Sequence, residues 1–150
     1  MIIPRSSTVV DNAIYWMLDR QGILEFHLNM QSLSFIKLPL VDADVDDCFK
    51  WQIMGAKGGQ LGLAILADLS IQFWERETNH GKHARWLLRK TVQSDNFLPA
   101  GCSPISILGF AEESKAIFLT TGDGLFMVHL ETMQYRKVLE EAEVYQIIPY

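Results

Sequence analysis

The chain has 150 residues, of which 49% are hydrophobic and 11% aromatic, and its formal net charge is -5. This composition excludes an intrinsically disordered chain, because disordered chains lack the apolar side chains needed to bury a core. The acidic balance argues against a nucleic-acid-binding surface, which requires concentrated positive charge.

The longest apolar stretch, Leu61–Leu69, is interrupted by Asp68 and is too short to cross a bilayer as a helix. The apolar run at the N-terminus is too short for a signal peptide. We therefore expect a soluble protein of the cytoplasm or nucleus. The cysteines, Cys48 and Cys102, form no CxxC pattern, so two free, partly buried thiols are expected in preference to a disulfide.

Along the first third of the chain, short apolar runs with an alternation of two predict strands. Two of these runs flank Asp19–Gly22, which predicts a hairpin in which Gly22 supplies a positive φ. The four predicted strands of this unit are Ser7–Val10, Ala13–Leu18, Ile23–Leu28 and Leu33–Leu38.

The middle third repeats this organisation, with a hairpin whose turn lies at Ala67 and Asp68. It differs by a longer polar segment, Arg76–Ala84, which we expect to be a loop. The four predicted strands are Trp51–Gly55, Leu61–Leu66, Leu69–Trp74 and Arg85–Val92.

The last third contains a hairpin with Asp123 and Gly124 at its turn, a pair strongly favoured there. Val144–Tyr150 begins a further strand. The four strands predicted before it are Ile105–Phe110, Ala116–Thr120, Leu125–Leu130 and Gln134–Leu139.

A unit of four strands that recurs about every fifty residues predicts an all-β fold, a kelch-like β-propeller segment of about three four-stranded antiparallel blades. Because closed propellers have roughly four to eight blades, we expect residues 1–150 to be a single domain that is a fragment of a larger propeller. The uncovered blade ends would then permit self-association. The alignment of the third strands places Leu24, Phe26 and Leu28 with Leu69, Ile71 and Phe73, and with Phe126, Val128 and Leu130.

Two histidines occupy equivalent places in this repeat, His27 in GILEFHLNMQ and His129 in GLFMVHLETMQ. The middle unit has Gln72 or Phe73 near the same slot, so no ring of histidines is expected. We interpret the pair as one structural position at a blade surface or a contact between blades.

Other candidate residues form incomplete motifs. His80 and His83 lie on the polar loop without the third and fourth ligands that zinc requires. Asp44 and Asp46 lie in VDADVDD, which lacks the glycine and glutamate of a calcium loop. We therefore predict no catalytic, cofactor or metal site. Trp74 follows Phe73 on one strand, so one ring faces outward or a neighbour. The interaction candidates are Trp74, His80, His83, Asp44 and Asp46.

The order and spacing of these strands resemble the F-box-associated region of plant F-box proteins, especially those of grasses. The resemblance covers nearly the whole chain, and the segments that carry it are VVDNAIYWM, GILEFHLNMQSLSFIKLP, RWLLRKTVQSDNFLP, ILGFAEESKAIFLTTGDGLFMVHLETMQYRKVLE and IIPY. It implies a propeller that captures substrates for a cullin-type ubiquitin ligase and contributes no catalytic residue.

We therefore expect a non-enzymatic module that recognises a protein substrate, with neither nucleic acid nor membrane as a partner. The helical F-box is missing from the sequence, since Leu38–Cys48 has the Leu-Pro pair but not the helical leucine spacing, so adaptor and cullin subunits are not expected to bind. The alternative is a small propeller enzyme or glycan-binding module, in which His80, His83 and the acidic loop would line a shared mouth.

Overall fold

The computed structural model describes residues 7–18, 22–39, 50–67, 69–79, 83–102 and 104–140, and these form three four-stranded antiparallel sheets. Each sheet uses four consecutive strands, as the repeat predicts. Sheet A contains β1 (Thr8–Val10), β2 (Ala13–Leu18), β3 (Gly22–His27) and β4 (Ser32–Lys37). Sheet B contains β5 (Trp51–Gly55), β6 (Leu61–Ala67), β7 (Ser70–Asn79) and β8 (His83–Gln93). Sheet C contains β9 (Pro104–Ala111), β10 (Ala116–Thr121), β11 (Gly124–His129) and β12 (Tyr135–Glu140).

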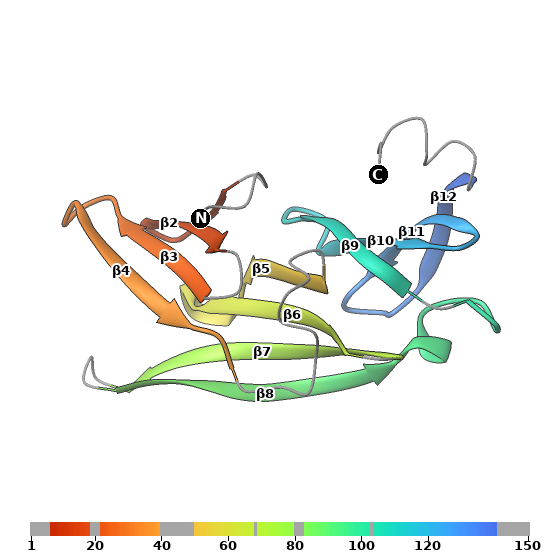
Figure 1. Cartoon of the computed structure of the whole chain (residues 1–150), viewed down its shortest axis with the longest axis horizontal. Coiled ribbons are helices and arrows are strands. Elements are labelled where there is room, and N and C mark those ends of the chain that lie inside the picture. Colours follow the sequence, from red (N-terminus) through yellow and green to blue (C-terminus); the bar gives the residue numbers. More distant parts are fainter. Residues whose placement is uncertain are drawn as a thin grey trace.

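The three sheets are arranged as an arc, with sheet B between the other two (Figure 1). The first strand of each sheet lies innermost, because β5 contacts both β1 and β9. The fourth strands, β4, β8 and β12, lie on the outside of the arc (Figure 1). This arrangement is that of consecutive propeller blades, and it confirms the predicted fold class.

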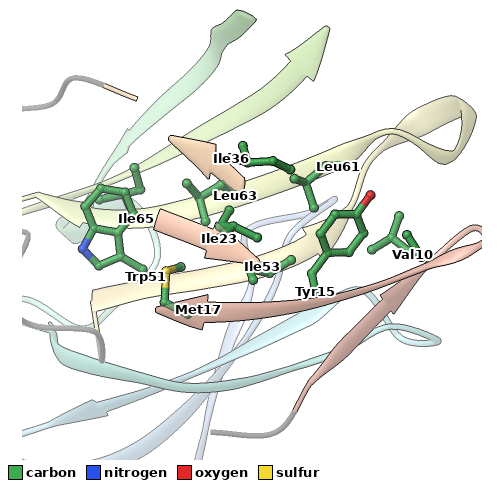
Figure 2. Close-up of a cluster of buried hydrophobic side chains, with 11 residues drawn as sticks. Val10, Tyr15, Met17, Ile23, Ile36, Trp51, Ile53, Leu61, Leu63 and Ile65 are labelled. Atoms are coloured by element: carbon green, nitrogen blue, oxygen red, sulfur yellow. The ribbon is translucent and has the colours of Figure 1, made fainter. Parts of the chain in front are cut away.

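Two apolar clusters hold the arc together, one in the seam between sheets A and B and one in the seam between sheets B and C. Figure 2 shows the first, in which side chains of β2 and β3 meet those of β5 and β6. All seven residues of β6 are buried, since its two faces supply both clusters. The fully buried side chains include Trp51, Ile65 and Ile23 in the A–B seam and Phe97, Ile117 and Val128 in the B–C seam.

The residues that follow β4 and β8 pack on the outer part of the two seams. After β8, a short 3-10 helix η3 (Ser94–Asn96) turns the chain so that Phe97 and Leu98 enter the B–C cluster. After β4, Leu38 packs on the A–B cluster. There the Trp86 indole N–H on β8 also donates to the carbonyl oxygen of Lys37 at 2.7 Å. The links between blades therefore also act as packing elements.

Two glycines of the repeat are required by close backbone approach. Gly22 and Gly124 begin the third strands of sheets A and C with φ of 156° and 135°. A Cβ at Gly22 would overlap the carbonyl oxygen of Ile36, and one at Gly124 would overlap that of Leu139. The predicted positive φ of Gly22 is thus confirmed, with a steric reason that lies on the fourth strand.

The register corrects the predicted alignment of the middle unit. At the hairpin ends Leu18 pairs with Gly22, Ala67 with Ser70 and Thr121 with Gly124. Counting from these ends, the residue equivalent to His27 and His129 is Glu75, and the prediction of Gln72 or Phe73 was wrong. The cause is Leu69, an apolar residue that lies in the turn and not in the strand.

The predicted loop Arg76–Ala84 was also largely wrong. Strand β7 continues to Asn79 and β8 begins at His83, with the two strands paired as far as Asn79 opposite His83. The Arg85 guanidinium contacts the Glu77 carboxylate across this ribbon at 3.2 Å. Charged cross-strand neighbours replace the apolar alternation here, so the ribbon looked like a loop from the sequence. The further strand predicted at Val144–Tyr150 lies outside the described residues.

Candidate interaction surface

The turns between the first and second strands of the three sheets lie next to one another, and we call this side of the arc the turn face. Asp11 in the turn of sheet A is 3.5 Å from a Cβ placed on Gly59 in that of sheet B. A Cβ on Gly55 would come within 2.7 Å of Glu112 in the turn of sheet C. On this face each seam opens into a depression.

The A–B depression has a volume of about 400 Å³. Its buried wall is a hydrogen-bonded set of three side chains. The Tyr15 hydroxyl donates to Glu25 Oε2 at 2.7 Å, and His27 Nε2 lies 3.1 Å from Glu25 Oε1. Tyr15 and Glu25 are cross-strand partners, while Glu25 and His27 are two residues apart on β3 and share its inner face.

The Tyr15 phenol stays a donor over the physiological range. Burial, followed by the hydrogen bond to Glu25, raises the pKa of Tyr15 well above its usual value of 10.0. Because Glu25 is buried and accepts from a protonated phenol, this wall is a satisfied polar network. This network holds the wall of the depression in place, and the polar side chains around it are Asp11, Gln60 and Arg76.

The B–C depression is larger, at about 640 Å³, and has a different chemistry. Its floor is apolar, with Met54, Phe73 and Leu130, which also pack on the B–C cluster. Its rim is charged, and the rim side chains are Glu75, Arg89, Lys115 and Glu131. An apolar floor inside a ring of both charges suits the side chain of a partner protein.

The two depressions are separated by the thickness of sheet B. Glu75 and Arg76 are neighbours on β7 and line opposite depressions, Glu75 the B–C one and Arg76 the A–B one. The Gln60 amide nitrogen donates to Glu75 Oε1 at 2.7 Å in the orientation that satisfies both ends of the amide. Arg89 contacts the same carboxylate oxygen at 3.5 Å. The depressions thus form neighbouring parts of one surface.

The position of the repeat that holds His27 in sheet A and Glu75 in sheet B lies on this surface. His27 lines the A–B depression and Glu75 lines the B–C depression, so the slot lies at the mouth of a seam. This placement confirms the interpretation of His27 as lying at a contact between blades. His129 takes the same slot on sheet C, on the face that points away from sheet B.

A third hollow, of about 500 Å³, is lined by the innermost strands of all three sheets. Thr8, Gln52 and Leu108 contribute to it from β1, β5 and β9. It follows from the arc itself, because first strands that lie innermost leave a concave side.

Of the predicted interaction residues, Trp74 is the one whose side chain is described. It is half-buried against the A–B cluster and borders the B–C depression, while Phe73 packs on the B–C cluster. Its indole N–H donates to Gln72 Oε1 at 3.0 Å. The backbone of His83 begins β8 and therefore does not lie in a loop. His80, Asp44 and Asp46 lie outside the described residues, so their role stays a prediction.

The described residues contain no group of three or more histidine, cysteine and acidic side chains placed to hold a metal ion. Cys102 is a free, partly buried thiol, as expected, whereas Cys48 is outside the described part of the chain. The Cys102 thiol donates to Asp123 Oδ2 at 2.7 Å. This hydrogen bond, with burial adding to it, raises the pKa of Cys102.

Tyr15, Glu25 and Arg76 were not among the residues predicted from the sequence. Glu25 replaces an apolar residue at the position that is Phe73 in sheet B and Met127 in sheet C. A charged residue at an inward position of an alternating strand was the available signal, and it is stronger once the register is known.

Within the described ranges, no helix is long and apolar enough to span a membrane.

Comparison with known proteins bears on the whole chain. No curated protein gives a significant match. The family model described as "F-box protein AT5G49610-like, beta-propeller" matches residues 3–150, and no F-box is detected. The match agrees with three stacked four-stranded sheets and confirms the resemblance drawn from the strand order. The chain belongs to this plant family of F-box-associated β-propellers.

Proposed function

We propose that the chain is a protein-interaction module that binds a protein substrate on its turn face and acts without catalysis of its own. The observation that carries the proposal is the pair of neighbouring depressions on one face of a propeller from an F-box protein family. One depression offers polar groups and the other an apolar floor with a charged rim. Together they suit a segment with an apolar anchor next to a charged or hydrogen-bonding residue.

The chemistry of the A–B depression supports binding in preference to catalysis. Glu25 accepts hydrogen bonds from a phenol kept protonated, and His27 lies against the same carboxylate. A buried network in which each polar group has a hydrogen-bond partner makes the surrounding surface rigid. Arg76 and Asp11 supply opposite charges at the edge, which favours orientation of a partner over uniform attraction.

By analogy with the family, we further propose that the bound protein is a substrate of a cullin-type ubiquitin ligase and that binding takes place in the cytoplasm or nucleus. In that arrangement an F-box docks the adaptor. The 150 residues bind the substrate, and recruitment of the adaptor and cullin subunits would depend on an F-box joined to the chain.

Affinity capture from plant tissue extract tests the interaction. The purified chain is compared with Arg76→Glu in the A–B depression and Leu130→Asp in the B–C depression. We expect both variants to lose a partner that the unmodified chain retains. Asp95→Lys on η3 is the control, because Asp95 is exposed and lies away from both depressions. Equal capture by all four proteins would refute the turn face as the binding surface.

Chemical cross-linking locates the partner independently of these substitutions. Lys115 lies on the rim of the B–C depression, whereas Lys90 is exposed on β8 at the outside of the arc. The captured partner should cross-link to Lys115 and not to Lys90.

The ligase role has a separate test. A fusion of an F-box to the N-terminus of the chain should bring the captured protein to ubiquitination in a reconstituted reaction. The unfused chain should compete with the fusion. Failure of the fusion to direct ubiquitin to a protein that it binds would remove the ligase role and leave the interaction role.

A further inference from the structure

Strand β4 is the last strand of sheet A and lies on the outside of the arc (Figure 1). On its neighbour β3, the backbone groups of alternate residues bond toward β2 and toward β4. The Leu28 N–H donates to the Asn12 carbonyl oxygen at the β2 side, at 2.9 Å. Counted back from Leu28, Glu25 bonds toward β4, where its partner is Ser34. The backbone groups of Ser34 therefore point inward, to β3.

The neighbours of Ser34 on β4, Leu33 and Phe35, consequently turn their backbone N–H and C=O groups outward. The same alternation turns the Lys37 carbonyl outward, which agrees with the hydrogen bond that this oxygen accepts from the Trp86 indole. Within the described ranges, no group bonds to the outward N–H and C=O of Leu33 and Phe35. Their side chains are 64% and 48% exposed. This edge thus offers backbone donors and acceptors beside two apolar side chains.

The outer strands of the three sheets differ in charge. Natural proteins place charged residues, lysine above all, on exposed edge strands to prevent pairing with another strand. The two other outer strands carry such basic residues, which are Arg85, Arg89 and Lys90 on β8 and Arg136 and Lys137 on β12. The sequence of β4 is SLSFIK, in which the charged residue is the last. Charge therefore does not oppose the pairing of Ser32–Ile36 with another strand.

The outward groups of β4 are complementary to those of β4 in a second copy. A two-fold axis at Ser34 places this residue opposite its own equivalent, and places Leu33 opposite Phe35 of the partner copy. Because Leu33 and Phe35 both point their backbone groups outward, each of the two Leu33–Phe35 pairs exchanges both of its N–H and C=O groups. The axis makes the two pairs identical, as a symmetric dimer requires.

The two adjacent registers of the same kind are blocked. An axis at Phe35 would pair Leu33 with Lys37 of the partner copy, and the Lys37 carbonyl oxygen already accepts from Trp86. An axis at Leu33 would pair Phe35 with Gln31, which precedes β4 and has a φ of 50°, outside the extended range of a strand. The axis at Ser34 is the register that uses the available groups of β4.

We propose that two copies of this chain pair β4 with β4 across this axis, so that their two four-stranded sheets A form one continuous antiparallel sheet. Each Leu33 side chain then lies beside Phe35 of the partner copy on one face, which removes exposed apolar surface from water. The pairing uses the outside of the arc, so it does not depend on what adjoins the first and last sheets. It is also independent of the turn face and of the proposed function.

Sedimentation equilibrium of the purified chain over a concentration series tests the dimer. We expect a monomer–dimer equilibrium. Leu33→Pro removes an outward N–H in each copy, and hence two of the four hydrogen bonds of the pairing, while the bonds between β3 and β4 remain. It should raise the dissociation constant by roughly tenfold or more.

Leu33→Lys tests the same edge without a proline, in case Leu33→Pro does not fold, as judged by thermal unfolding. It should also weaken the dimer, because it replaces the apolar contact with Phe35 by a charge on the edge. Leu69→Lys is the matched control, because Leu69 is a leucine 55% exposed in the β6–β7 turn. This control should leave the dissociation constant unchanged.

Disulfide cross-linking tests the register, in a chain that also carries Cys48→Ser and Cys102→Ser. Ser34→Cys should give a covalent dimer on mild oxidation, since residues directly opposite in an antiparallel pair are within disulfide reach. Ser32→Cys should not, because the two copies of residue 32 lie about 13 Å apart along the strands. Non-reducing electrophoresis separates the two results. A chain that is monomeric at every concentration, a dimer insensitive to both folded Leu33 variants, or equal cross-linking at the two positions would each overturn the proposal.

Discussion

The indole N–H of Trp86 on β8 donates to the carbonyl oxygen of Lys37 on β4 at 2.7 Å, so a hydrogen bond joins the outer strands of two blades. The two residues are 49 positions apart in the chain. Packing alone could allow the sheets to slide along their apolar faces. A directional bond at the outside of the seam fixes their relative position.

Trp86→Phe keeps an aromatic ring against the A–B cluster and removes this donor. We expect the free energy of unfolding to fall by about 1 kcal/mol, the usual net value of one hydrogen bond. Urea denaturation measures the change. Trp86→Ala, which also removes the packed ring, should cost more, and a Phe variant as stable as the unmodified chain would show that the bond contributes nothing.

Gly124→Ala should be strongly destabilising because the new Cβ would overlap the Leu139 carbonyl oxygen at a φ of 135°. Positive φ in a non-glycine residue costs about 1–3 kcal/mol, and the clash with β12 adds to it. Gly122→Ala in the same turn is the control, since its Cβ would meet nothing within 4 Å, and should change stability by less than about 0.5 kcal/mol. Equal midpoints of denaturation for the two variants would contradict the steric argument.

Tyr15→Phe removes a donor from the buried Glu25 carboxylate and should cost about 1–3 kcal/mol at neutral pH. Because the pKa of Tyr15 is raised in the folded state, its contribution is present below the ordinary pKa of 10.0 and declines as the pH rises above it. The stability difference between the unmodified chain and Tyr15→Phe should therefore narrow in alkaline solution. Unfolding measured in a pH series checks this, and a difference that stays constant would argue against a raised pKa.

The Cys102 thiol should react slowly with iodoacetamide because its hydrogen bond to Asp123 raises its pKa and leaves less thiolate. Asp123→Asn removes the charged acceptor and should increase the alkylation rate of Cys102 at mildly alkaline pH. Peptide-level mass spectrometry separates Cys102 from Cys48. Asp95→Asn, a neutral change at an exposed site, should leave the rate as it was, and no increase in Asp123→Asn would exclude the hydrogen bond as the cause.

The strands and their grouping could be predicted from the sequence because alternation and turn residues act locally. Ala13–Leu18 and Trp51–Gly55 were predicted at the bounds that the structure has. The errors in the middle sheet have a common origin. Leu69 lies in a turn although it is apolar, and Thr78 and Asn79 lie in a strand although they are polar.

The candidate surface could not be predicted, because it depends on how blades meet. Nothing local in the sequence indicates that Arg76 and Gly59 border one depression. Nor does it indicate that Phe97 and Leu98, which follow the last strand of sheet B, pack into the seam between sheets B and C. These relations follow from the stacking of sheets, which brings together residues distant in the chain. The same is true of Trp86 and Lys37.

The burial of β6 on both faces has a consequence for how the molecule opens. Leu63 packs toward sheet A, and its neighbour Ala64 packs toward sheet C. One strand therefore belongs to both apolar clusters. Fluctuations that expose β1 or β12 can leave the rest folded, whereas exposure of β6 must separate both seams at once. Amide protons of β6 should thus exchange with solvent only through global unfolding and should be the last to do so.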